Sequence, residues 1–110
     1  MLFRSLAVGD PRLAGSARMS AARAHANDDD LAAAVTSAKD AIEQFTEVGD
    51  QSAITDAYLW IANYSLQSGD HDDALQAARD ALTFATSEEA ETLIGWSRFY
   101  AGKALYQLVV

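Results

Sequence analysis

Cysteine is absent from this chain of 110 residues. Without cysteine, the protein has no disulfide bond, no thiolate nucleophile and no cysteine-based zinc site. A reducing cytoplasm is compatible with this composition, and we expect a cytoplasmic protein. The chain also lacks any apolar run that approaches the roughly 20 residues of a membrane-spanning helix, so we expect no membrane span.

Residues that interrupt helices are scarce as well. The chain contains one proline and six glycines. Half of its residues are hydrophobic, and many of these are alanine, the strongest helix former, whereas β-branched residues are sparse. This composition predicts an all-α fold, and the length predicts a single domain over residues 1–110.

Basic residues are half as frequent as acidic ones. Eight Lys and Arg against 16 Asp and Glu give a net charge of -8, which argues against nucleic-acid binding because a phosphate backbone needs a basic surface. Residues 1–27 hold four arginines and one aspartate, whereas the remainder holds four bases and fifteen acids. A chain polarised in this way could associate head to tail or prefer a basic partner, and the plainer interpretation is a solvated surface.

Two copies of Val-Gly-Asp, at 8–10 and 48–50, indicate an internal repeat with a period of 40 residues. Counted from Pro11, the period gives these units: 11–50, 51–90 and a partial third, 91–110. Identical residues then recur 40 positions apart: Ala17 and Ala57, Ala22 and Ala62, Asp30 and Asp70, Ala34 and Ala74, Ala38 and Ala78, Asp40 and Asp80, and Ala41 and Ala81. Small residues therefore recur where a pair of helices needs them to pack closely.

Each unit predicts two helices. Apolar residues recur at helical spacing, and the predicted helices cover 12–26, 31–47, 54–68, 71–85 and 88–110. Gly69 can end a helix in the left-handed conformation, and Asp70 can cap the next helix by accepting hydrogen bonds from its first N–H groups. Ser87, followed by acidic residues, predicts the N-cap of the last helix.

The Val-Gly-Asp copies mark the junction between the second helix of one unit and the first helix of the next. Residues 1–10 are then expected to be the end of a preceding unit rather than a targeting peptide. The last predicted helix, 88–110, is then expected to be a first helix whose partner is absent. We therefore expect the chain to be a segment of a longer array, whose units stabilise one another.

The pattern resembles the tetratricopeptide repeat, most clearly over residues 55–88. The resemblance is carried by an aromatic, an aliphatic and a small residue in the first helix, Gly-Asp at the turn and small residues in the second helix: Tyr58, Ile61, Ala62, Gly69, Asp70, Ala74 and Ala81. The sequence departs from the family pattern in its period, which is similar to the long 40-residue variant, and at these residues: Ser65, Ala78, Thr86, Arg18 and Arg98. The resemblance implies an α-solenoid of antiparallel helix pairs, with about five helices plus an N-terminal helix remnant.

In the tetratricopeptide family the first helices of the units line a concave groove that takes peptides. The resemblance implies the same function here, a protein–protein interaction module for a peptide or protein partner. The candidate partner-binding residues at the corresponding positions are Arg23, Trp60, Asn63, Gln67, Phe99, Tyr100 and Lys103. Aromatic side chains supply buried area, and Arg23, Asn63 and Lys103 form a column that suits a peptide backbone or a carboxylate. The alternative is that the aromatic side chains pack between units.

Two other functions remain open at this point. Long repeats of this kind are similar to arrays in larger bacterial-type signalling proteins or transcriptional regulators, so the chain could be a sensory or regulatory segment. The last helix is apolar around much of its circumference over 95–110, and such a helix is usually covered. We therefore expect a homo-oligomer through this helix, with a following unit or another partner as the alternatives.

Catalytic and metal-binding patterns are weak. His25 and His71 are the only histidines, and no motif places either beside a nucleophile. A metal site at His71 with Asp72 and Asp73 is conceivable, but successive helical residues do not share a face, and helix capping explains these acids better. No phosphate loop is present. We expect no enzyme activity, no cofactor and no metal.

Overall fold

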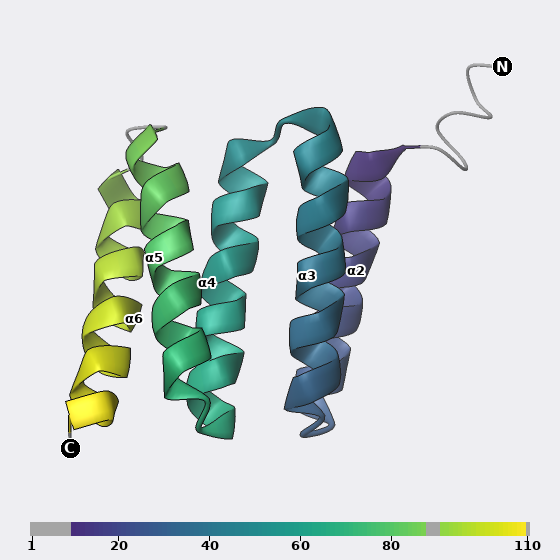
Figure 1. Cartoon of the computed structure of the whole chain (residues 1–110). Coiled ribbons are helices and arrows are strands. Elements are labelled where there is room, and N and C mark those ends of the chain that lie inside the picture. Colours follow the sequence, from purple (N-terminus) through teal and green to yellow (C-terminus); the bar gives the residue numbers. More distant parts are fainter. Residues whose placement is uncertain (1–9, 88–90, 110) are drawn as a thin grey trace, which may run out of the picture.

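A computed structural model describes residues 10–87 and 91–109 of the chain, and these residues form five α-helices (Figure 1). The helices are α2 (Pro11–Asn27), α3 (Leu31–Val48), α4 (Gln51–Ser68), α5 (His71–Ser87) and α6 (Glu91–Val109). The described part of the chain contains no strand, so the prediction of an all-α fold is confirmed. The helix remnant expected over residues 1–10 lies almost entirely outside the described residues.

The helices start every 20 residues, at Pro11, Leu31, Gln51, His71 and Glu91. This spacing comes from the turns. A residue in the left-handed conformation follows each of α2, α3 and α4: Asp29 (φ 61°), Gly49 (φ 70°) and Gly69 (φ 85°). An aspartate follows each of them, and its backbone N–H donates to the carbonyl five residues back, as from Asp50 to Phe45 at 3.1 Å. These are Schellman turns, which satisfy the last carbonyls of a helix.

The same aspartates begin the next helices. The side chains of Asp30 and Asp50 accept hydrogen bonds from the N–H groups of Ala33 and Ala53, three residues ahead. Asp10 accepts from the N–H of Arg12 at 2.9 Å. One short acidic side chain thus stabilises the start of each of these three helices, α2, α3 and α4, by about 1 kcal/mol.

Two of the predicted caps differ in the structure. The Asp70 carboxylate accepts a hydrogen bond from Ser68 Oγ at 3.1 Å, rather than the predicted backbone bond. Ser87 does not cap the last helix, because it is the final residue of α5 and its hydroxyl donates to the Phe84 carbonyl at 2.8 Å. The acids that follow, Glu88 and Glu89, lie outside the described residues, and α6 begins at Glu91 rather than residue 88.

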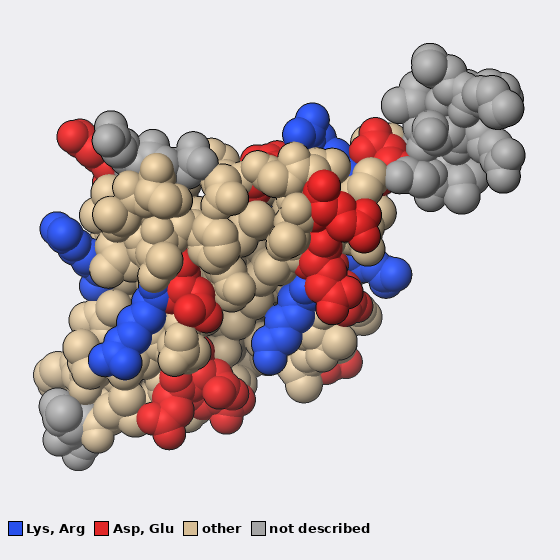
Figure 2. Space-filling model, turned by 45° about the horizontal axis from the view of Figure 1, so that its top comes forward, with Lys and Arg blue, Asp and Glu red and all other residues tan. Residues whose placement is uncertain are grey.

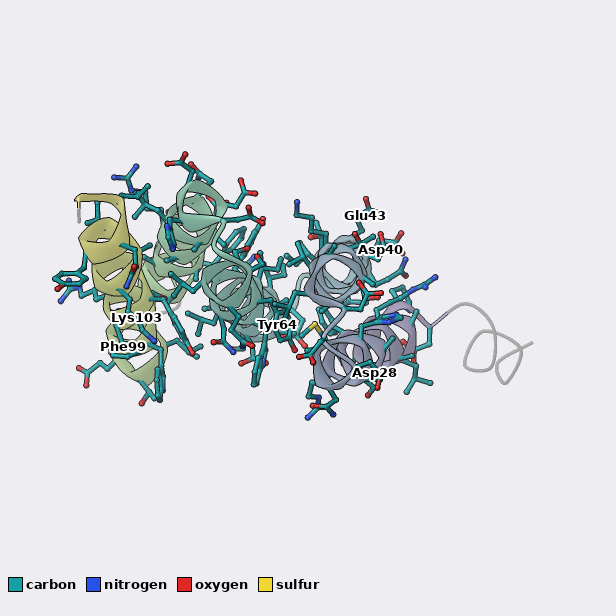
Figure 3. The ribbon with its side chains drawn as sticks, turned by 90° about the horizontal axis from the view of Figure 1, so that it is seen from below. Asp28, Asp40, Glu43, Tyr64, Phe99 and Lys103 are labelled. Atoms are coloured by element: carbon teal, nitrogen blue, oxygen red, sulfur yellow. The ribbon has the colours of Figure 1, made fainter. Side chains whose placement is uncertain are left out.

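Successive helices run in opposite directions and lie side by side from α2 to α6 (Figure 1). Viewed along the helices, α2, α4 and α6 lie on one side, and α3 and α5 lie on the other (Figure 3). Each helix packs against the next one in the chain, and α4 also contacts α6. This arrangement is consistent with a short α-solenoid, in which the first helices of the units form one face and the second helices the other.

Alanine makes up most of the core. Four of the five alanine pairs that recur 40 residues apart are fully buried in both units: Ala22 and Ala62, Ala34 and Ala74, Ala38 and Ala78, and Ala41 and Ala81. In the fifth pair Ala57 is buried and Ala17 is exposed. A methyl side chain lets two helices approach closely and costs no side-chain entropy. The 40-residue repeat in the sequence therefore corresponds to a repeat in packing.

The third copy of the first helix departs from this pattern. Gly102, which corresponds to Ala22 and Ala62, is exposed, and a Cβ atom built on it would meet nothing within 4 Å. Arg98 and Arg18, which correspond to Tyr58, are also exposed. Ser97 and Ala104 are instead the fully buried residues of α6. No helix in the described residues is both long enough and apolar enough to cross a membrane.

Candidate binding groove on the first-helix face

A pocket of about 320 Å³ lies between α4 and α6, on the face that α2, α4 and α6 form. We call it the α4–α6 pocket, and its lining residues are Asp56, Leu59, Trp60, Thr92, Leu93, Trp96 and Tyr100. Three of them are aromatic and two are leucines. Asp56 is the one charged residue among those that line it.

A second hollow of about 230 Å³ lies between α2 and α4. This α2–α4 pocket is lined by Ser16, Met19, Ser20, Arg23, Phe45, Ala53 and Asp56. Asp56 lines both pockets, so the two hollows adjoin across α4. Together they form a surface whose α6 end is aromatic and whose α2 end carries hydroxyls and a guanidinium.

The aromatic rings of α6 support one another. Trp96 and Tyr100, one helical turn apart, stack with their centroids 6.2 Å apart and their planes 28° apart. Phe99 meets Tyr100 edge to face at 5.3 Å and Trp96 edge to face at 5.8 Å. On α4, Trp60 stacks on Tyr64 at 5.7 Å. Such contacts hold rings in place and contribute about 0.5–1.5 kcal/mol each beyond their buried area.

Asp56 is an exposed residue, but the side chains around it partly remove its carboxylate from water. Burial against the neighbouring side chains raises its pKa above the ordinary value of 3.8. The Trp60 indole, one turn further along α4, and the Arg23 charge on α2 both act in the opposite direction, with the smaller effect. No ion pair joins Arg23 to Asp56 within 4.0 Å in the described structure. Asp56 therefore presents a negative charge to the pockets, and this charge is only partly compensated.

Three of the seven predicted partner-binding residues line the two pockets, and four do not. Arg23, Trp60 and Tyr100 line the pockets of the first-helix face. Phe99 lines a shallower hollow on the outer side of Trp96, and Lys103 Nζ lies 5.7 Å above the Phe99 ring (Figure 3). Asn63 is half-buried and Gln67 exposed on α4, and neither lines the two pockets. The column of Arg23, Asn63 and Lys103 thus contributes Arg23 alone to these pockets.

Only Trp60 and Tyr100 of the seven residues that line the α4–α6 pocket were predicted partner-binding residues, and two of the other five give the pocket its character. Trp96 is 51% exposed and forms a wall of the pocket, and Asp56 supplies its charge. The 40-residue period contains the missing signal, because Asp56 and Trp60 correspond to Trp96 and Tyr100. Residues one turn apart share a helix face, so the pocket joins two equivalent pairs.

The opposite side of the molecule carries a more polar hollow of about 340 Å³ between α3 and α5. Its floor includes Ile61 of α4, and its rim carries Lys39, Asp73 and Asp80. Figure 2 shows acidic and basic side chains on both sides of the hollow on this face. Asp40 and Glu43 also project from the outer side of α3 (Figure 3). Charges of both signs therefore cover this side, as expected for a solvated surface.

The metal site considered at His71 has no structural support. Within 10–87 and 91–109, no three His, Asp or Glu side chains come close enough together to hold a metal ion. His71, Asp72 and Asp73 lie in the first turn of α5, where acidic side chains interact favourably with the positive end of the helix dipole.

The sequence matches no protein-family model, and no curated protein or solved structure is significantly similar to it.

Proposed function

We propose that this chain is a helical-repeat interaction module, resembling tetratricopeptide repeats, that binds a peptide or protein segment along the face formed by α2, α4 and α6. We propose a cytoplasmic location and no catalytic role. The observation that carries this proposal is the α4–α6 pocket, where Trp60, Trp96 and Tyr100 surround a cavity with an acidic residue at its edge.

An aromatic pocket on a helical surface suits a binding role. Binding energy at protein interfaces is concentrated in a few aromatic and charged residues near the centre of the contact. Trp96 is 51% exposed and Phe99 is 52% exposed, so both rings have area to bury against a partner. The adjoining α2–α4 pocket, with Ser16, Ser20 and Arg23, would extend the contact with hydrogen-bond donors. The face thus offers an aromatic end and a polar end to a bound peptide.

Selection from a random peptide library displayed on phage tests the proposal. Peptides selected on the immobilised 110-residue chain are titrated against it and against the variants Trp96→Ala, Arg23→Ala and Lys103→Ala. We expect Trp96→Ala to weaken the selected peptides about 30-fold, as loss of a central aromatic does, and Arg23→Ala to weaken them less. Glu43→Ala on the outer side of α3 is the control and should change affinity less than about twofold. Peptides whose affinity is the same for all three groove variants would contradict the proposal.

A second candidate function, self-association through α6, rests on a different observation. Beyond the pocket, α6 also exposes Leu105, Tyr106 and Leu108, at 45%, 63% and 41%. Exposed Gly102 lies where Ala22 and Ala62 are covered by a neighbouring helix, so a helix of a second copy could pack there. Light scattering over a hundredfold range of concentration tests this candidate: growth in mass with concentration supports it, and a monomer throughout excludes it.

A further inference from the structure

The α4–α6 pocket is lined by three aromatic side chains and one carboxylate. Trp60 and Asp56 come from consecutive turns of α4, and Tyr100 and Trp96 come from consecutive turns of α6. The two leucines of the lining, Leu59 and Leu93, are apolar, and Thr92 adds one hydroxyl. The pocket is therefore poor in hydrogen-bond acceptors but rich in aromatic surface, with one net negative charge.

This combination favours one type of ligand. The face of an aromatic ring attracts a cation, and the attraction is strongest for Trp and grows when the cation is shielded from water. A bare ammonium group carries three N–H donors, which would lose their water partners in an apolar pocket. An alkylated ammonium group has few or no donors to satisfy, spreads its charge over its methyl groups and presents an apolar surface to the rings.

The chain's own cations are placed elsewhere. Lys103 Nζ lies over the Phe99 ring, on the outer side of the α6 aromatic cluster. Arg23 lines the α2–α4 pocket and makes no ion pair with Asp56 within 4.0 Å in the described structure. Asp56, Trp60, Trp96 and Tyr100 thus line a space that no lysine or arginine of the described residues lines.

We propose that the α4–α6 pocket binds an alkylated ammonium group, presented as a methylated lysine side chain of the peptide that occupies the groove. This inference rests on the proposed function and specifies its ligand. In this arrangement Trp60, Trp96 and Tyr100 enclose the trimethylammonium group, and Asp56 supplies the opposite charge. The neighbouring peptide residues extend toward Arg23 and the α2–α4 pocket.

Tryptophan fluorescence gives a direct test, because the only two tryptophans of the chain, Trp60 and Trp96, both line the pocket. The full chain is titrated with the amide of N-acetyl-trimethyl-lysine, with its uncharged tert-butyl analogue of the same shape, and with choline. We expect saturable binding of the trimethyl-lysine amide, about tenfold tighter than the uncharged analogue. Equal affinity for the charged and uncharged probes, or no saturation by either, would overturn the proposal. Choline binding as tightly as the amide would overturn the assignment to a peptide side chain.

Variants separate a specific site from a general charge effect. Asp56→Asn should weaken the charged probe about tenfold and leave the uncharged analogue unchanged, whereas Glu43→Gln, with the same change of charge, should alter neither. Replacing both tryptophans by fluorinated tryptophan weakens the negative potential of the rings without changing their shape much. Affinity for the charged probe should then fall with each added fluorine, and an unchanged affinity would contradict a cation–ring contact. This second measurement keeps the test decisive if Asp56→Asn folds poorly.

The outcomes also separate this inference from the proposed function. One outcome would refute the ammonium site and leave the peptide-binding function standing. In it, library peptides depend on Trp96 but contain no cation at the anchoring position, and the charged and uncharged probes bind with equal affinity. Saturable, charge-selective binding of the trimethyl-lysine amide, with library peptides indifferent to Trp96, would refute the peptide-binding function instead.

Discussion

The helix pairs α2–α3 and α4–α5, called hairpins here, bury alanines at four equivalent positions. They differ in which helix carries the larger residue at a fifth. In α2–α3 the first helix carries Gly15 and the second carries Phe45, and an added Cβ at Gly15 would meet the Phe45 ring at 2.6 Å. In α4–α5 the corresponding residues are Thr55 and Ala85, both fully buried. We infer that the Thr55–Ala85 pair takes the place of the Gly15–Phe45 pair, with the larger residue on the first helix instead of the second.

Helix α6 extends the comparison to a position that has no following helix in the described residues. Gly95 corresponds to Gly15 and Thr55, and Gly102 corresponds to Ala22 and Ala62, yet a Cβ atom on either glycine meets nothing within 4 Å. The same repeat positions are therefore tightly packed in two copies and open in the third. The consequence is that aromatic residues of α6 remain exposed beside the pocket.

The largest effect should follow from removing the ring that fills the first hairpin. Phe45→Ala should lower the free energy of unfolding by about 3–5 kcal/mol, because it leaves a cavity beside Gly15. Adding Gly15→Thr copies the Thr55–Ala85 pair and should restore part of the loss. Urea unfolding of both single variants and the double variant measures the coupling, which we expect to be about 1–3 kcal/mol. Simple additivity would show that the two hairpins do not fill equivalent space.

The next effect compares two glycines of the same helix layer. Gly15→Ala should destabilise the protein by about 1–3 kcal/mol, because its methyl group would overlap the buried Phe45 ring. Gly102→Ala should stabilise it by about 0.5–1 kcal/mol, because alanine is the better helix former and nothing lies within 4 Å. Thermal and urea unfolding should therefore give shifts of opposite sign. A destabilising Gly102→Ala would mean that the Gly102 position is covered in solution.

The sequence predicted the helices better than the turns and the pocket. The 40-residue period and the glycines at 49 and 69 identified the hairpins, because helix signals and left-handed turns depend on nearby residues. The prediction of Ser87 as an N-cap was wrong. A serine followed by acids is a typical N-cap pattern, but α5 extends through Ser87. The repeat places Asp56 and Trp96 on the groove face, but they were left out of the candidate partner-binding residues. Their roles in the pocket depend on how α4 and α6 pack, and side-chain spacing within one helix does not specify this.

A smaller effect is expected at Tyr64, which has no counterpart of its size in the other first helices. It packs on the side of α4 that faces α2 and α3, and its hydroxyl is buried with no hydrogen-bond partner in the described structure (Figure 3). Tyr64→Phe removes an unsatisfied polar group and should leave stability unchanged or raise it by up to about 1 kcal/mol. Tyr64→Leu, which also removes the ring, is the comparison and should destabilise. A loss above about 1 kcal/mol in Tyr64→Phe would show that the hydroxyl is bonded in solution.

The smallest effect concerns Asp56 and depends on pH. Because burial raises its folded-state pKa above 3.8, the ionised carboxylate disfavours the folded state at neutral pH, and this penalty disappears as the pH falls below 3.8. Asp56→Asn should therefore be slightly more stable than the parent protein at pH 7, by less than about 0.5 kcal/mol for this partly exposed group, and no more stable at pH 3. Glu43→Gln controls for the overall change in charge. A stability gain that is equal at both pH values would contradict the burial of Asp56.

The proposed function requires an α4–α6 pocket that is open to a partner, and acrylamide quenching of Trp96 tests this directly. In a Trp60→Phe variant, Trp96 is the only emitting tryptophan, and its side chain is 51% exposed beside the pocket. Quenching is measured over a hundredfold range of protein concentration. For an open pocket we expect efficient quenching that does not change with concentration. Quenching that falls as the protein is concentrated would contradict it and show that a second copy covers the α6 aromatic surface.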